Sequence, residues 1–277
     1  MAVSFTERLR RIQSKKSSSL CIGLDPDPDL LPKHLSARQA LPEAILAFNS
    51  AIIEATRHTA CAFKVNFAFY EVLGTEGWRV LYETVQMLPE DVLIIADAKR
   101  GDIGNSARFY ARATFEELGC DAITVTPYMG RDSIEPFLQY EGKAAFILAR
   151  TSNPGASDFQ EQQIHDKPLY RLVAESVARW DHHAKGTAGL VVGATSSDAL
   201  DALRQICPTL PFLIPGVGAQ GGDADTVMRS AATPDGPVLV NSSRAILYAS
   251  AGEDFAQAAA REAERLRDTM ERARHPR

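Results

Sequence analysis

Short apolar runs recur along the chain, and longer amphipathic segments separate them. Runs of roughly four to eight apolar residues, rich in β-branched side chains, predict buried strands. Eight are expected, at residues 19–25, 61–67, 92–99, 122–128, 144–150, 189–195, 212–218 and 238–244. Helical periodicity predicts helices between them, at residues 42–57, 77–88, 106–118 and 169–182. This alternation indicates a parallel sheet covered by helices.

Eight strand–helix units within 277 residues match the size of a (β/α)8 barrel, or TIM barrel. Length alone would also allow two small domains. No linker rich in Pro, Gly or Ser divides the chain, which favours one domain over residues 1–277. A doubly wound sheet is the alternative, but no G-x-G-x-x-G motif follows the first strand to support it.

Charged residues stand inside two of the predicted strands. In "VLIIADAKRGDIGN" (92–105), Asp97 and Lys99 share one strand face at period 2, and Asp102 follows three residues later. Lys64 interrupts the second strand in the same way. Ionised side chains are rarely buried unless they are paired or functional, because desolvation is costly. A single one is explained by an internal ion pair or by snorkelling to the rim, whereas several at one barrel end indicate a functional site.

Further polar residues stand at the carboxyl ends of the predicted strands, where (β/α)8 barrels carry their sites. The loop "IPGVGAQGGD" (214–223) contains glycines that allow close backbone approach to an anion. Arg244 follows the last strand, and the loops after strands seven and eight usually bind phosphate in this fold. We therefore predict a phosphate site there. The residues at the strand ends are Asp25, Lys64, Asp97, Lys99, Ser152, Gln220 and Arg244.

Composition excludes several classes of protein. The net charge of −5 gives no electrostatic case for nucleic acid binding, and no apolar run is long enough to span a membrane. The first residues lack the apolar core of a secretory signal, so a cytoplasmic protein is expected. The adjacent His182 and His183 do not face one another on a helix, and no metal site is expected. Reduced, buried thiols are predicted for Cys21, Cys61, Cys120 and Cys207, which form no C-x-x-C pair.

The motif "DAKRGDI" resembles the D-x-K-x-x-D-I signature of the orotidine 5'-phosphate decarboxylase family. The segments "FKVNFAFYE", "ARTSNPG" and "PGVGAQGG" resemble the bacterial branch with the longer chain, and the resemblance runs from about residue 20 to 247. It implies a (β/α)8 barrel that decarboxylates orotidine 5'-phosphate to UMP, the last step of de novo pyrimidine nucleotide synthesis. It also implies that no cofactor or metal takes part, and that an obligate homodimer forms two shared sites.

The resemblance further implies a role for individual residues. Lys64, Asp97 and Lys99 would form an alternating charged array beside the C6 carboxylate, with Lys99 as the proton donor. Asp102 would complete the array in the neighbouring subunit's site. Ribose would be held by Asp25 and Lys64, and from the partner chain by Asp102 and Ser106. The pyrimidine would contact Ile103 and Ser152, the phosphate would contact Gln220 and Arg244, and Val217 and Gly218 would also bind substrate.

The chemistry of the reaction agrees with these roles. Loss of CO2 from C6 leaves an electron pair in an sp2 orbital perpendicular to the ring π system, so delocalisation does not help. The sequence shows no signature of a pyridoxal, thiamin or metal electron sink. A preorganised cation where negative charge develops remains as the source of stabilisation. Lys99 would supply that cation and could then deliver the proton.

Three other functions compete with this interpretation. A magnesium-dependent decarboxylase of a 3-keto sugar phosphate resembles this pattern, but it has a metal-binding glutamate where Lys64 stands. A class I aldolase needs a neutral lysine, whereas Lys99 beside carboxylates would stay protonated. A nucleotide-binding regulator on the same barrel would be expected to lack part of the array.

Two segments carry no firm assignment. Residues 152–168 form a longer loop than usual and are interpreted either as a lid over the pyrimidine or as a passive surface insertion. The charge-rich carboxyl-terminal segment predicts an amphipathic helix with a solvated face.

Overall fold

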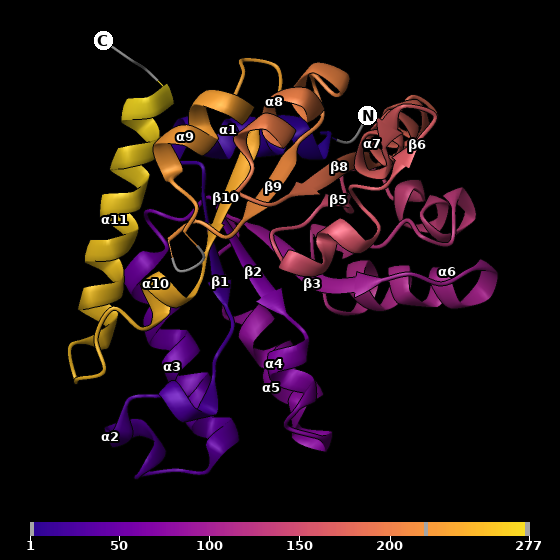
Figure 1. The fold of residues 1–277 in the computed structure, drawn as a ribbon. Coiled ribbons are helices and arrows are strands. Elements are labelled where there is room, and N and C mark those ends of the chain that lie inside the picture. Colours follow the sequence, from indigo (N-terminus) through magenta and orange to yellow (C-terminus); the bar gives the residue numbers. More distant parts are fainter. Residues whose placement is uncertain (1–2, 219–220, 275–277) are drawn as a thin grey trace.

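The computed structural model describes residues 3–218 and 221–274 and forms a closed barrel of parallel strands (Figure 1). The strands are hydrogen-bonded in the order β1-β10-β9-β8-β5-β4-β3-β2. The predicted (β/α)8 barrel and its eight strands are confirmed. They are β1 (Leu20–Leu24), β2 (Ala62–Asn66), β3 (Leu93–Arg100), β4 (Ala122–Val125), β5 (Ala144–Arg150), β8 (Thr187–Val192), β9 (Phe212–Pro215) and β10 (Val238–Ser242).

Helices cover the outside of the barrel (Figure 1). The four helices that periodicity predicted are present, with ends shifted by a few residues. The expected helix 106–118 begins earlier, at Gly104, and passes into a π-helical turn, η2 (Ala113–Glu117). The α-helices are α1 (Phe5–Lys16), α2 (Lys33–Ser36), α3 (Leu41–Thr56), α4 (Ala68–Glu71), α5 (Thr75–Gln86), α6 (Gly104–Arg112), α7 (Leu169–Asp181), α8 (Ser197–Ile206), α9 (Ala224–Ala231), α10 (Arg244–Leu247) and α11 (Phe255–Arg274).

Helix α1 closes the end of the barrel where the strands begin. It starts at a capping box in which Ser4 and Glu7 satisfy each other's backbone N–H groups. Its fully buried Phe5 packs edge-on against Phe146 of β5, with ring centroids 5.8 Å apart. Gln13 donates a hydrogen bond to the carbonyl of Val238 at 2.6 Å. The end of the barrel where the strands begin is therefore filled by packed side chains among the described residues.

The carboxyl-terminal helix α11 is more than a solvated surface element. It is amphipathic as expected, but it packs against α3 and α9 (yellow in Figure 1). Leu266 and Met270 are almost fully buried in that contact. The predicted amphipathic helix is therefore present, and the alanines between its charged residues let its apolar face approach the barrel closely.

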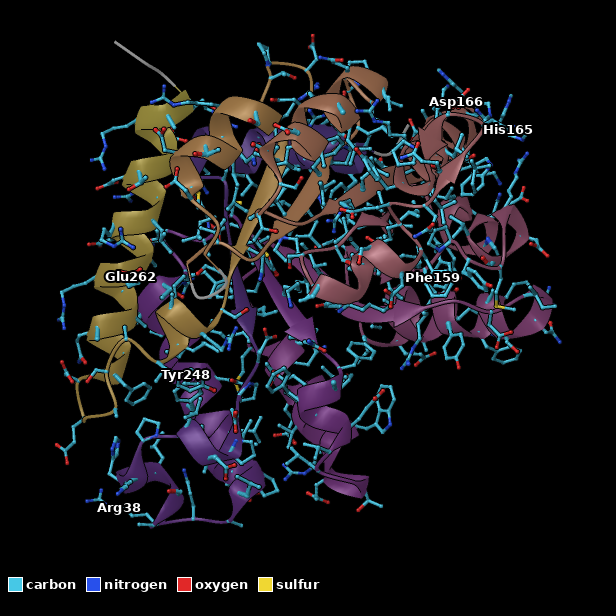
Figure 2. All side chains as sticks on the ribbon, in the orientation of Figure 1. Arg38, Phe159, His165, Asp166, Tyr248 and Glu262 are labelled. Carbon is cyan, nitrogen blue, oxygen red and sulfur yellow. The ribbon has the colours of Figure 1, made fainter. Side chains whose placement is uncertain are left out.

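Residues 152–168 contain a 3-10 turn, η5 (Pro154–Asp158), and a small hairpin of β6 (Gln163–Ile164) and β7 (Lys167–Pro168). His165 and Asp166 form its tip with positive φ angles of 48° and 64°. Figure 2 shows this tip at the outer edge of the molecule. The hairpin therefore faces outward, whereas Ser152, Asn153 and Gln160 of the segment line the cavity at the barrel mouth. No helix among the residues described here is long and apolar enough to cross a membrane.

Candidate active site

A cavity of about 730 Å³ opens at the carboxyl ends of the strands, and all eight strands or the loops after them contribute to its wall. Polar side chains line one part of it and apolar side chains from β5, β8 and β9 line another. Of the site residues predicted from sequence, the structure brings together Asp25, Lys64, Asp97, Lys99, Ser152, Val217 and Arg244.

Four charged residues form a continuous alternating chain on the cavity wall. Lys64 Nζ lies 3.5 Å from Asp25 Oδ1 and 2.9 Å from Asp97 Oδ2. The other oxygen of Asp97, Oδ1, lies 2.7 Å from Lys99 Nζ. The Lys64 side chain is only 4% exposed, whereas that of Lys99 is 50% exposed. Lys64 is thus an internal link, and Lys99 is the ammonium group that a ligand can reach.

The surroundings keep these buried groups ionised. Burial acts to lower the pKa of Lys64, but the carboxylates of Asp25 and Asp97 outweigh it and hold the pKa above its usual range. Burial likewise acts to raise the pKa of Asp97, but Lys64 and Lys99 outweigh it and hold that pKa well below its usual range. A fixed anion between two ammonium groups is therefore present at neutral pH.

The backbone of β3 is irregular around Asp97 and Lys99. Its pairing with β4 shifts register between Ala96 and Arg100, and Lys99 has a positive φ of 45°. Thr124 of β4 bonds to both residues at this register shift. Its Oγ1 accepts a hydrogen bond from the Lys99 N–H at 3.0 Å and donates one to Asp97 Oδ1 at 2.9 Å. Asp97 and Lys99 do lie together as predicted, but a bulge brings Lys99 there rather than regular period-2 alternation.

The predicted phosphate site is a glycine-rich turn after β9. Gly216 and Gly218 have positive φ angles of 102° and 83°, which only glycine adopts readily. The Gly222 N–H closes the turn on the Gly216 carbonyl at 3.1 Å. Arg244 is the first residue of α10, just after β10, the strand that pairs with β9. It lines the same cavity. Gln220 lies outside the described residues.

The second half of the D-x-K-x-x-D-I motif lies away from this cavity. Asp102 turns back on its own backbone, and its Oδ1 accepts a hydrogen bond from the Ile103 N–H at 2.8 Å. Ile103 is half exposed and Ser106 is exposed on the first turn of α6. None of the three lines the cavity of its own chain.

Sequence reasoning missed several cavity residues. Tyr248 accepts a hydrogen bond from the Asp27 N–H at 2.6 Å and donates one to the Asp25 carbonyl at 3.3 Å, so it fixes the turn after β1. Asn241 is 6% exposed, and its Oδ1 has no hydrogen-bond partner in the part of the chain that the structure describes. Thr124 and Gln160 also line the cavity. The polar Asn241 inside "VLVNSSR" was a signal that could have been used.

The described ranges contain no group of three or more His, Cys, Asp or Glu residues that could hold a metal ion. All four cysteines are buried and free, as predicted. Burial raises the pKa of the Cys61 thiol to about 12, so it is an unreactive core residue.

Comparison with known proteins shows the family of this chain. A model described as "Orotidine 5'-phosphate decarboxylase / HUMPS family" matches residues 18–261. The chain belongs to this family. The orotidine 5'-phosphate decarboxylase of Dehalococcoides mccartyi is 47% identical over 273 residues, covering 97% of each chain. The resemblance seen in the sequence motifs is confirmed.

Solved structures of this family agree. The OMP decarboxylase of Leishmania donovani has a TM-score of 0.81 and 36% identity, covering 96% of this chain and all of that one. The UMP synthase of the same organism has a TM-score of 0.83 and 38% identity, and this chain spans 57% of its length. The enzyme class predicted from the sequence, a carboxy-lyase, is that of the family.

Proposed function

We propose that this member of the decarboxylase family converts orotidine 5'-phosphate to UMP in the cavity, using its own side chains and no cofactor. The observation that carries the proposal is the alternating chain Asp25–Lys64–Asp97–Lys99, with Asp97 held between two ammonium groups at 2.9 and 2.7 Å. Such a series of charged groups is costly to desolvate, and ionisable clusters that line a cavity are candidates for a functional site.

The reaction breaks the bond between C6 and its carboxylate. The electron pair stays on C6, CO2 departs, and a proton replaces it. The Lys99 ammonium group stabilises the charge as it develops, because it is fixed by Asp97 before the reaction begins. Its proton then passes to C6. Lys99 regains a proton from water, to which its half-exposed side chain has access.

Binding energy from the rest of the nucleotide supports this step. Enzymes lower barriers by up to roughly 23 kcal/mol, far more than one lysine supplies. Arg244 provides a cation for the 5'-phosphate, and Gly216 and Val217 of the glycine-rich turn line the cavity beside it. Asp25 and Lys64 provide partners for the ribose hydroxyls. Holding both groups orients C6 against Lys99, so remote contacts contribute to the rate.

We propose a homodimer in which Asp102 and Ser106 enter the neighbouring subunit's cavity, with Ile103 against the pyrimidine. Support comes from their position outside the cavity of their own chain. Large apolar side chains are also exposed on α6 and after β4, including Phe109 (62%) and Tyr128 (86%). An exposed apolar patch beside a site is typical of a protein interface.

The competing magnesium-dependent decarboxylase is disfavoured by the position of Lys64. Its Nζ lies between Asp25 and Asp97, two of the carboxylates that line this cavity. A divalent cation there would meet an ammonium group held protonated by its neighbours. A Schiff base on Lys99 would require its Nζ to leave the ion pair with Asp97 at 2.7 Å. A regulator without activity would not need the complete array.

We further propose that residues 1–277 act as one domain in the cytoplasm. The packing of α1 into the barrel end and of α11 onto α3 supports a single unit. Four free thiols suit a reducing compartment.

The proposed activity is tested by following the ultraviolet absorbance of orotidine 5'-phosphate with the purified protein in excess EDTA. We expect conversion to UMP at the same rate with and without the chelator. Activity that disappears in EDTA and returns with Mg²⁺ would contradict the cofactor-free account. A Lys99→Ala chain is the control for contaminating enzyme.

A further inference from the structure

Gln160 reaches from the insertion after β5 back to the strand end that carries Ser152. Its Oε1 accepts a hydrogen bond from the Thr151 N–H at 2.8 Å, and its Nε2 donates one to Thr151 Oγ1 at 2.9 Å. Thr151 Oγ1 in turn donates to Asn153 Oδ1 at 2.6 Å. One carboxamide therefore holds the residue before Ser152, and through it the residue after.

Gln160 is itself held in place. Its N–H donates to the Ala156 carbonyl at 2.8 Å, and its carbonyl accepts from the Tyr170 N–H at 2.9 Å. The next residue, Glu161, forms an ion pair with Arg150 at 2.5 Å. The insertion is thus fastened to the end of β5 at two neighbouring points, and it can serve as a rigid support.

Ser152 also packs closely against Gly193. Gly193 is the residue after β8. A Cβ on Gly193 would lie 2.8 Å from Ser152 N and 2.9 Å from Ser152 Cβ, so only glycine leaves room for Ser152 here. The Gly193 N–H donates to the Arg150 carbonyl at 2.7 Å. Ser152 therefore lies against Gly193 and directly follows Thr151, which the Gln160 carboxamide holds, and it lines the cavity.

We propose that Gln160 is a positioning residue that sets Ser152 for recognition of the pyrimidine amide edge, and so sets selectivity for a uracil-type ring. This inference rests on the proposed function, in which Ser152 contacts that edge. A cytosine-type ring carries an amino group at C4 and no hydrogen on N3, which reverses the donor and acceptor pattern. A rigidly placed hydroxyl and backbone can exploit that reversal, whereas a mobile one can adapt to either pattern.

The test is a double-mutant cycle read by binding calorimetry of UMP and CMP to the full chain. The variants are Ser152→Ala, Gln160→Ala and both together. We expect Gln160→Ala to reduce the preference for UMP over CMP by roughly 10-fold or more, in the same direction as Ser152→Ala. The double variant should lose no more than the larger single loss, because both changes remove one function.

Gln162→Ala is the matched control. This glutamine lies in the same insertion, and its Nε2 donates a hydrogen bond to the Ser157 carbonyl at 3.0 Å. It should leave the preference unchanged, and thermal melts should show that all variants fold. Gln160→Glu, which keeps the acceptor for the Thr151 N–H, should recover part of the preference.

An unchanged preference in Gln160→Ala, or losses that simply add in the double variant, would overturn the inference. Failure of the proposed function gives a different result. The native protein would then leave orotidine 5'-phosphate unconverted, or Ser152→Ala would keep the full preference for UMP.

Discussion

The Nζ of Lys99 lies 2.7 Å from Oδ1 of Asp97, although the Lys99 backbone has a left-handed φ of 45°. A non-glycine residue in this region costs about 1–2 kcal/mol. The conformation persists because the ion pair to Asp97 and the hydrogen bond from the Lys99 N–H to Thr124 hold it. Strain of this kind is typical of positions where the exact direction of a side chain matters.

Thr124→Val tests this support. The substitution keeps the shape but removes the hydroxyl that bridges Asp97 and the Lys99 N–H. Loss of a hydrogen bond to a charged group costs about 1.5–3 kcal/mol, so we expect kcat to fall roughly 10- to 100-fold. Thr124→Ser, which keeps the hydroxyl, should retain most of the activity. Equal damage in both variants would mean that packing, not the hydroxyl, is important.

The low pKa of Asp97 makes its contribution to stability depend on pH. Because the folded-state pKa lies below the unfolded value of about 3.9, the contribution is present above pH 4 and is lost as the pH falls towards the folded value. We therefore expect Asp97→Asn to lower the free energy of unfolding by about 3 kcal/mol at pH 7. The deficit should shrink in acid. Urea unfolding of both proteins from pH 7 to pH 3 measures it, and a deficit that grows in acid would contradict this sign.

Arg244→Ala separates phosphate binding from structural support. If phosphate contacts contribute to the rate, kcat/KM for orotidine 5'-phosphate should fall by several orders of magnitude. Slow turnover of orotidine, which lacks the phosphate, should hardly change. Comparison of the two substrates under identical conditions measures the difference. Equal losses with both would show that Arg244 maintains the fold of the loop.

A mixture of Lys99→Ala and Asp102→Ala chains tests the shared site. Each variant alone should be nearly inactive. In a heterodimer one site carries both lesions and the other carries neither, so activity should return in up to about half of the sites. Isolation of the heterodimer with two different affinity tags measures this directly. Confirmed heterodimers without recovery would place Asp102 in the site of its own chain.

Much of the architecture followed from the sequence, because buried strands and amphipathic helices leave different periodicities. The array was visible for a related reason: Lys64 and Asp97 are charged residues inside apolar runs, and charge in a core is a strong signal. Thr124 gave no such signal, since threonine is common in strands for its branched shape alone. Its function depends on a register shift between β3 and β4 that local sequence does not specify.

Other features depended on contacts between distant parts of the chain. Tyr248 meets Asp27 across more than two hundred residues. The amphipathic pattern of α11 predicted a helix with a solvated face but did not identify α3 and α9 as the elements that its other face contacts. Pairings of this kind become visible only once the barrel has closed.

The central claim is that Lys99 stabilises the charge that develops at C6. Single-turnover decarboxylation by Lys99→Ala, together with calorimetric affinity for UMP, tests it most directly. We expect the rate to fall by at least about four orders of magnitude, since removal of a key catalytic group costs that much in other enzymes. UMP affinity should stay within about tenfold, because phosphate and ribose contacts remain. A Lys99→Ala chain that decarboxylates within about tenfold of the native rate would contradict the account.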